Sequence, residues 1–299
     1  MITCGLYTAI ITPFNEQGKL DEEAFKELIA KQNQAGVSGL VVMGATGEGA
    51  VLTSQERKKI LKIAREEAGL LKIFAGINAY STFELIETIK ECENWGADGA
   101  LVAPPCFIKP TQEGIRRHFE EACHQTKLPL LLYNHHGRTG VNIETETLLK
   151  LVELPAIVGV KEASGNLLQA CDVLDQTKRK KPGFLVFSGD DPMTYPLMTL
   201  GADGVISVVS NLIPDAMFEL VHALLQQEQI KARALHYRLL PLFKAIFLET
   251  NPIPIKAAMR LCGLPGGSPR LPLTPLNECF LPALEKVLEE LDLLQETFV

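Results

Sequence analysis

Residues 157–164 read Ile-Val-Gly-Val-Lys-Glu-Ala-Ser, a short apolar run that ends in a lysine, Lys161. A continuous apolar and β-branched run, without alternating polar residues, is typical of a β-strand that is buried on both faces. Such strands belong to parallel sheets that are covered by helices. The stretch therefore predicts an α/β fold with a charged residue at the end of a buried strand.

Seven further runs of the same kind occur along the chain, at residues 7–14, 39–44, 72–78, 99–105, 129–134, 184–191 and 204–210. Helical patterns lie between them, with candidate capping boxes that begin at Thr53 and Ser81. Glycines 36, 96 and 201 lie where helix C-caps are expected. Eight strands that are each followed by a helix predict a (β/α)₈ TIM barrel. The alternative is a doubly wound open sheet, but residues 12–19 (TPFNEQGK) do not form its glycine-rich phosphate loop.

The chain divides into two predicted parts. Residues 1–225 form the catalytic barrel, and residues 226–299 contain helical patterns alone. We expect 228–247 to be a closing barrel helix, followed by a small C-terminal helical domain. Residues 263–275 are rich in glycine and proline and are expected to be a loop.

Composition excludes several classes of function. The 299 residues carry a net charge of -7, which argues against nucleic acid or an anionic membrane as partner. Seven cysteines, an odd number with no C-x-x-C pair, predict free thiols in the cytoplasm rather than disulfides or structural zinc. The first residues lack the basic segment of a signal peptide, and no apolar run is long enough to span a membrane.

Lys161 is the most informative residue for chemistry. In a barrel, catalysis takes place at the C-terminal ends of the strands. Burial lowers the pKa of a lysine, and the neutral amine can attack a keto acid to form an imine. The alternative is a structural ion pair with an acid on a neighbouring strand, and Lys161 alone does not decide between them.

Three other strand ends carry candidate groups. Tyr133 can relay protons, and Thr46 lies in a glycine-rich turn whose N–H groups suit a carboxylate. Arg138 offers a bidentate fork for a second carboxylate. Taken singly, each has a plainer interpretation: a rim tyrosine, a tight turn and a solvated arginine.

Two pairs of neighbours suggest metal ligands. His135 and His136 are adjacent, so they are expected to point in opposite directions, and no H-x-x-x-H or C-x-x-C partner exists. Asp190 and Asp191 fit either a magnesium site or the start of a helix. We therefore predict no metal.

A set of motifs runs through the chain in order: AIITPF (9–14), GATGEG (44–49), KPTQEG (109–114), YN (133–134), GRTGV (137–141), GVKEAS (159–164), SGDD (188–191), GVISV (204–208), NPIPIK (251–256) and LPLTPL (271–276). In these motifs the chain resembles the dihydrodipicolinate synthase and N-acetylneuraminate lyase superfamily over nearly its whole length. The resemblance implies a (β/α)₈ barrel with a helical C-terminal domain and no metal or organic cofactor.

The resemblance also implies roles for five residues. Lys161 matches the Schiff-base lysine, and Tyr133 matches the catalytic proton donor and acceptor. Thr46 and the backbone of Ile206 match the groups that bind pyruvate, and Arg138 matches the arginine that binds the carboxylate of the aldehyde substrate. The implied reaction condenses pyruvate with L-aspartate-4-semialdehyde in lysine and diaminopimelate biosynthesis. The implied assembly is a homotetramer (a dimer of dimers) or a homodimer.

Two positions depart from the family pattern. The synthases typically have a threonine at Ala45, and at Phe107 a tyrosine that reaches in from the neighbouring subunit. With Tyr133 those hydroxyls form a proton relay. The resemblance therefore leaves open a slow synthase, another pyruvate-dependent aldolase acting on sialic or sugar acids, and a paralogue that binds keto acids without turnover.

The lysine feedback site is also altered. At four positions this chain differs from the family members that lysine inhibits, whereas Ala50 and Glu84 match them. The altered positions are Ser54, Arg57, Tyr80 and Cys106. We expect weak or absent inhibition by lysine.

Overall fold

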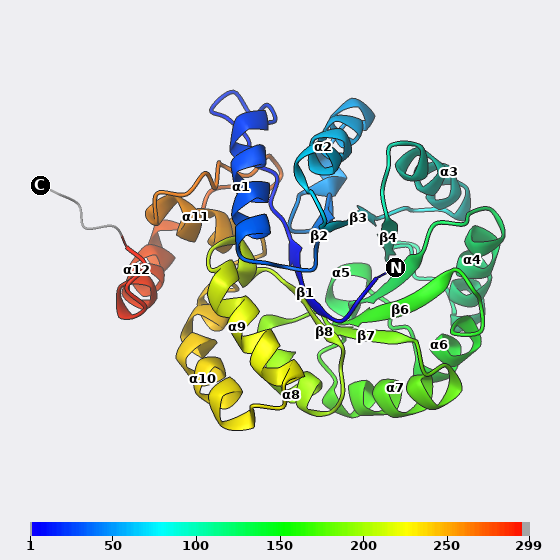
Figure 1. Cartoon of the computed structure of the whole chain (residues 1–299). Coiled ribbons are helices and arrows are strands. Elements are labelled where there is room, and N and C mark those ends of the chain that lie inside the picture. The colour runs from blue at the N-terminus through cyan, green and yellow to red at the C-terminus, as the bar shows by residue number, and fades with distance from the viewer. Residues whose placement is uncertain (1, 295–299) are drawn as a thin grey trace, which may run out of the picture.

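A computed structural model of the chain describes residues 2–294. Eight parallel strands, paired in chain order and closed by β8 against β1, form a barrel (Figure 1). The strands are β1 (Gly5–Ala9), β2 (Gly39–Val42), β3 (Lys72–Ile77), β4 (Gly99–Val102), β5 (Leu130–Asn134), β6 (Ile157–Glu162), β7 (Leu185–Ser188) and β8 (Gly204–Ser207). The predicted TIM barrel is confirmed, and the open-sheet alternative is wrong.

Helices surround the barrel and continue beyond it (Figure 1). They are α1 (Glu22–Gln34), α2 (Ser54–Glu67), α3 (Thr82–Asn94), α4 (Gln112–His124), α5 (His136–Thr139), α6 (Thr145–Leu151), α7 (Leu167–Lys180), α8 (Thr194–Thr199), α9 (Pro214–Leu225), α10 (Gln229–Ala245), α11 (Ile253–Leu261) and α12 (Leu281–Glu290). Four 3₁₀ turns also occur: η1 (Gly49–Val51), η2 (Asp191–Met193), η3 (Val209–Asn211) and η4 (Glu278–Phe280). Helix α9 follows β8 and packs on β1, so it is the helix that closes the barrel. We expected residues 228–247 to be that helix, but most of them form α10, which packs on α8, α9 and α12.

The helix caps expected from the sequence are formed by residues a few positions apart. The Thr53 hydroxyl accepts the Glu56 N–H, and the Glu56 carboxylate accepts the Thr53 N–H, which completes the capping box of α2. At α3 only half of the box forms, because Glu84 accepts the N–H of Tyr80 instead of that of Ser81. Glycines 36, 96 and 201 have φ angles of 74°, 91° and 104°, as glycines after helix ends do.

Two apolar cores follow from the alternation of side chains along the strands. One lies between the barrel and its helices. The other fills the barrel, where Tyr7 packs edge-on against Phe74 and Phe187. This filled interior closes the barrel below Tyr133 and leaves its C-terminal end as the place for a site.

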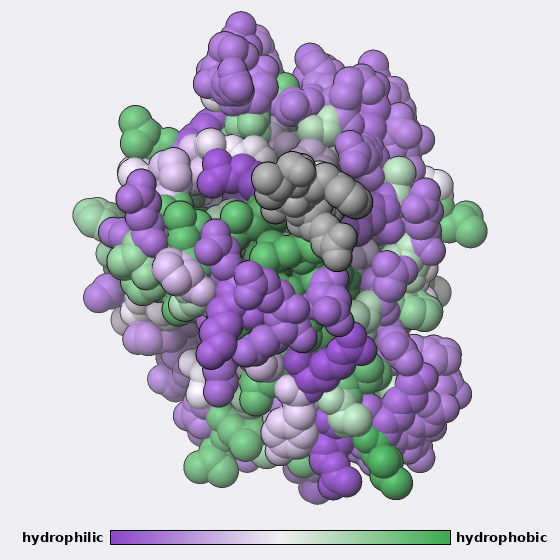
Figure 2. All heavy atoms as spheres, turned by 90° about the vertical axis from the view of Figure 1, so that its left-hand side faces the viewer, coloured by the Kyte–Doolittle hydropathy of each residue, from purple (hydrophilic) through white to green (hydrophobic). Residues whose placement is uncertain are grey.

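The C-terminal helices are tied to the loop after β2. Lys256 of α11 forms a buried ion pair with Glu48, and the Arg270 guanidinium forms two hydrogen bonds with Glu56. Within this loop a side chain at position 49 would clash with the backbone, because a Cβ added to Gly49 would lie 1.8 Å from Met43 O. The outer face over α10–α12 is mostly hydrophilic, with separate apolar patches (Figure 2). Among the described residues, no helix is long and apolar enough to cross a membrane.

Candidate active site

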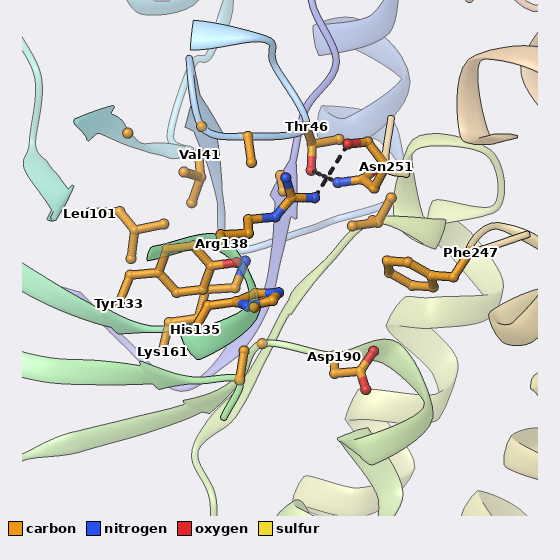
Figure 3. Close-up of a pocket in the computed structure, with 18 of the residues that line it drawn as sticks. Val41, Thr46, Leu101, Tyr133, His135, Arg138, Lys161, Asp190, Phe247 and Asn251 are labelled. Atoms are coloured by element: carbon orange, nitrogen blue, oxygen red, sulfur yellow. Dashed lines mark hydrogen bonds between the residues drawn. The ribbon is translucent and has the colours of Figure 1, made fainter. Parts of the chain in front are cut away.

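A cavity of about 620 Å³ opens at the C-terminal end of the barrel. Its walls come from the ends of β2, β5, β6 and β7 and from the end of α10 together with Asn251 (Figure 3). Five of the residues singled out from the sequence line it together: Ala45, Thr46, Tyr133, Arg138 and Lys161. Ile206 is buried in the barrel interior, and Phe107 is 86% exposed outside the cavity. The structure thus gathers most of the predicted site in one place.

Lys161 lies beside Tyr133, because the two residues are paired in register on β6 and β5. Its side chain is 5% exposed, and its Nζ lies 4.6 Å from the centroid of the Tyr133 ring. Burial, reinforced by the Arg138 charge, lowers the pKa of Lys161 to about 8, against the opposing pull of Asp191 and Asp190. About one amine in ten is then neutral at pH 7, compared with fewer than about one in a thousand for an ordinary lysine.

No ion pair to Lys161 is found among residues 2–294. Its neighbour Glu162 points to the other side of the strand, where it accepts the Ser164 N–H and an N–H of Asn134. The alternative interpretation of Lys161 as half of a structural ion pair is therefore wrong.

Gly189 makes room for the lysine. A Cβ at this position would lie 3.0 Å from both Cγ and Cε of Lys161 and 2.6 Å from the Ala163 Cβ. Even an alanine at this strand end would therefore press on the amine stem. The glycine of the SGDD motif keeps the lysine side chain free to extend into the cavity.

Tyr133 is enclosed together with Lys161. Burial raises the pKa of Tyr133 to about 12, although the nearby Arg138 lowers it in part. The phenol is therefore protonated at neutral pH and can donate its proton to a leaving oxygen. A proton that it gives away must be replaced by a neighbouring group, because little of the ring reaches solvent.

The turn of residues 44–49 is closed by its own hydrogen bonds. The N–H groups of Glu48 and Gly49 bond to the carbonyls of Ala45 and Gly44. The Thr46 side chain is 4% exposed and faces the cavity. The tight turn therefore presents the Thr46 side chain to the cavity.

Asn251 joins the two predicted carboxylate binders. Its side-chain Nδ2 donates to Thr46 Oγ1 at 2.9 Å, and its backbone carbonyl accepts from Arg138 Nη2 at 3.3 Å (Figure 3). Sequence reasoning missed this residue, although the NPIPIK motif contains it. The link fixes the hydroxyl of Thr46 and the fork of Arg138 relative to each other.

Asp190 and Asp191 have different environments. Asp191 is buried, and its Oδ2 accepts the N–H groups of Val208 and Val209, which fixes the turn after β8. Asp190 lines the cavity, and burial, helped by Asp191, raises its pKa to about 6 against the opposing charge of Lys161. The Asp190 side chain does not cap η2, so the capping interpretation is wrong for it.

His135 lines the cavity whereas His136 is exposed, as their adjacency predicted. Burial, with smaller contributions from Arg138 and Lys161, lowers the pKa of His135 to about 4. Among residues 2–294, no group of three or more His, Cys, Asp or Glu side chains could hold a metal ion.

Comparison with known proteins identifies the family. The sequence model of the "Dihydrodipicolinate synthetase family" matches residues 3–291. The chain is 48% identical to a 4-hydroxy-tetrahydrodipicolinate synthase of Protochlamydia amoebophila, over 96% of each chain. Its fold matches the crystal structure of the dihydrodipicolinate synthase of Thermotoga maritima with a TM-score of 0.95 and 40% identity, covering 98% of this chain and all of that one. A monomeric dihydrodipicolinate synthase variant matches with a TM-score of 0.95 and 39% identity over 98% of each chain. The chain therefore belongs to the dihydrodipicolinate synthetase family.

Proposed function

We propose that this protein is a 4-hydroxy-tetrahydrodipicolinate synthase, which condenses pyruvate with L-aspartate-4-semialdehyde through a Schiff base on Lys161. The observation that carries the proposal is the buried Lys161, which has no ion-pair partner in residues 2–294 and lies beside a protonated Tyr133. The 48% identity to a synthase of that name supports the substrate pair.

In the first half-reaction, the neutral amine of Lys161 adds to the keto carbon of pyruvate. The carbinolamine then loses its hydroxyl, which leaves as water with the proton of Tyr133, and the nitrogen lone pair forms the C=N bond. Thr46 and the turn around it hold the pyruvate carboxylate, with the backbone of Ile206 as the second contact. The protonated imine is the electron sink for the next step.

In the second half-reaction, the imine loses a methyl proton to a water in the cavity and becomes an enamine. The enamine carbon attacks the aldehyde, whose oxygen takes the phenol proton of Tyr133, and a carbon–carbon bond forms. The substrate amine then displaces Lys161 by transimination, which closes the ring and frees the enzyme. Arg138, held by the Asn251 carbonyl, binds the aldehyde substrate's carboxylate.

Arg138 also separates this reaction from that of a sialic acid or sugar-acid aldolase, which handles a polyol. We expect turnover of pyruvate with L-aspartate-4-semialdehyde, and no comparable cleavage of sialic acid or keto-deoxy sugar acids in parallel assays. Arg138→Leu should raise KM for the aldehyde by on the order of 10²-fold while it leaves KM for pyruvate nearly unchanged. Preferred cleavage of a sugar acid would contradict the assignment.

We propose a homotetramer or homodimer for the assembly. In the segments that follow the paired strands β3 and β4, Phe83 and Phe107 are 76% and 86% exposed in the single chain, and Tyr80 and Ile108 are exposed with them. Exposed large apolar side chains on these neighbouring segments support an interface between copies. Sedimentation at micromolar concentration tests this, and a monomer there would contradict it.

We further propose a cytoplasmic location and weak or absent inhibition by lysine. All seven cysteines are free thiols, which supports a reducing compartment. At the altered feedback site, Arg57 Nη2 donates to the carbonyl of Gly49, and the Glu84 carboxylate accepts the Tyr80 N–H. Both side chains are thus engaged within the chain, which supports weak binding of lysine. Half-inhibition by lysine below about a millimolar would contradict the second proposal.

A further inference from the structure

Tyr133 needs a partner that exchanges protons with it. Turning a neutral amine and a ketone into a protonated imine and water takes up one proton from solvent, and Tyr133 is too enclosed to obtain it alone. The neighbouring wall of the cavity offers little help. Ala45 on that wall has no hydroxyl, Phe107 outside the cavity has none either, and the Thr46 hydroxyl is held in place by the hydrogen bond that it accepts from Asn251.

His135 lies where such a partner is needed. Its ring meets the Tyr133 ring edge-on, with 5.7 Å between the ring centroids and an interplanar angle of 86°. The charges of Arg138 and Lys161 both act on the imidazole, so it lies near the reacting groups. Figure 3 shows the ring projecting into the cavity beside Tyr133 and beneath Arg138.

The chain also shapes this position for an imidazole. The ring folds over Gly137, where an added Cβ would lie 3.1 Å from Cε1 and 3.4 Å from Nδ1 of His135. The Nδ1 atom is enclosed and has no hydrogen-bond partner among residues 2–294. His135 occupies the N-cap position of α5, yet its side chain does not cap the helix. No structural bond in the described part of the chain therefore accounts for the imidazole.

We propose that His135 is a positioning residue that holds the water through which Tyr133 is reloaded during imine formation, in place of the hydroxyls absent at Ala45 and Phe107. The inference rests on the proposed Schiff-base reaction. When the carbinolamine C–O bond breaks, Tyr133 gives its proton to the leaving oxygen. The phenolate takes a proton from a water that is hydrogen-bonded to His135 Nε2, and that water takes a proton from solvent. One solvent proton is consumed, as the balance requires.

The charge state of the imidazole suits this role. Its lowered pKa keeps the ring neutral above about pH 5, so one nitrogen carries a proton and the other a lone pair. A neutral ring with its lone pair on Nε2 accepts a hydrogen bond from the water and holds it beside Tyr133. A permanently charged side chain at this position would instead repel or trap the anionic substrates.

The test compares His135→Val with His136→Val, which removes the exposed neighbouring histidine. Three quantities are measured in the full-length enzyme: kcat with both substrates, KM for pyruvate, and the rate of borohydride trapping with pyruvate alone. We expect His135→Val to lower kcat and the trapping rate by on the order of 10²-fold, with KM for pyruvate within about threefold. His136→Val should stay within about twofold of the parent.

Two rescue experiments separate this positioning of the water from a purely structural role. Added imidazole should restore activity to His135→Val, and Ala45→Thr should raise activity about tenfold or more in the same background, a larger factor than it gives in the parent. His135→Asn is measured alongside and interpreted in the same way if the valine variant does not fold. The proposal is wrong if either variant keeps parental kcat, or if neither rescue has an effect. A Lys161→Ala variant with parental turnover would instead overturn the proposed function, whatever His135 does.

Discussion

Among residues 2–294, Lys161 and Lys256 are each buried under an aromatic ring, and they differ in their polar partners. Lys161 lies 4.6 Å from the ring of Tyr133, and Lys256 lies 4.5 Å from the ring of Phe14. Lys256 is paired with the Glu48 carboxylate and donates to a backbone carbonyl, that of Ser268. Lys161 has no such partner among the described residues. Burial alone therefore does not make a lysine reactive.

The environment of each amine explains its use. At Lys256, burial lowers the pKa and the Glu48 charge opposes that change, and the ion pair with Glu48 joins α11 to the loop that carries Thr46. At Lys161, burial lowers the pKa, and the next strongest influence on the pKa, the repulsive charge of Arg138, lowers it further. The neutral amine is therefore more readily formed. One lysine stabilises the site, and the other is free to react in it.

The largest expected effect is that of Lys161→Met. We expect kcat/KM to fall by on the order of 10³-fold or more, because the nucleophile is lost. The unfolding free energy at pH 7 should rise, by about 2 kcal/mol, since the folded state holds the Lys161 proton less tightly than the unfolded state does. Thermal unfolding and steady-state kinetics measure the two changes. A variant that is both active and less stable would contradict this interpretation.

Lys256→Met should have the opposite effect on the free energy of unfolding and lower it. It leaves the Glu48 carboxylate buried without its cation, which costs about 3–5 kcal/mol of stability. Lys256→Met with Glu48→Gln, which removes both charges, should recover part of that loss. Denaturant unfolding measures both variants. Equal stability of the single and double variants would show that the pair does not couple.

Glu56→Gln tests the more exposed ion pair between α2 and the C-terminal region. The Arg270 hydrogen bonds lower the pKa of Glu56 to about 2, below its unfolded value, so its contribution to stability is present above about pH 4.5 and is lost as the pH falls toward 2. Solvent screening keeps the expected cost near 1 kcal/mol at pH 7. Unfolding at pH 7 and pH 3 should show the cost shrinking, and a cost that grows at low pH would contradict the sign.

The pH dependence of imine formation reports the lowered pKa of Lys161 directly. Since the pKa of Lys161 is about 8, the trapping rate should rise roughly tenfold per pH unit up to that value and then level off. An ordinary lysine would keep the rate rising to about pH 10. Single-turnover trapping between pH 6 and 10 distinguishes the two curves.

Much of the fold could be predicted because its signals are local. Eight apolar runs, glycines 36, 96 and 201 after helices, and the Thr53 capping box each depend on a few adjacent residues. Lys161 was recognisable for the same reason, since a lysine in an apolar strand is unusual. The chemistry of the lysine could not be decided locally, because it depends on whether an acid on a neighbouring strand pairs with the amine.

The rest of the site depends on contacts between distant parts of the chain. Asn251 reaches Thr46 across 205 positions, and this contact exists only because the C-terminal helices pack over the loop after β2. The clearance that Gly189 gives Lys161 is also a product of tertiary packing, and sequence spacing does not predict it. The contact between Gly137 and His135, by contrast, is local, since the two residues lie two positions apart.

Borohydride trapping with pyruvate, followed by peptide mapping, tests the central comparison most directly. Both lysines are present in one molecule, so Lys256 is an internal control for Lys161. We predict a pyruvate adduct on Lys161 and none on Lys256. An unmodified Lys161, or equal modification of Lys256, would contradict the conclusion that the unpaired environment of Lys161 makes it the nucleophile.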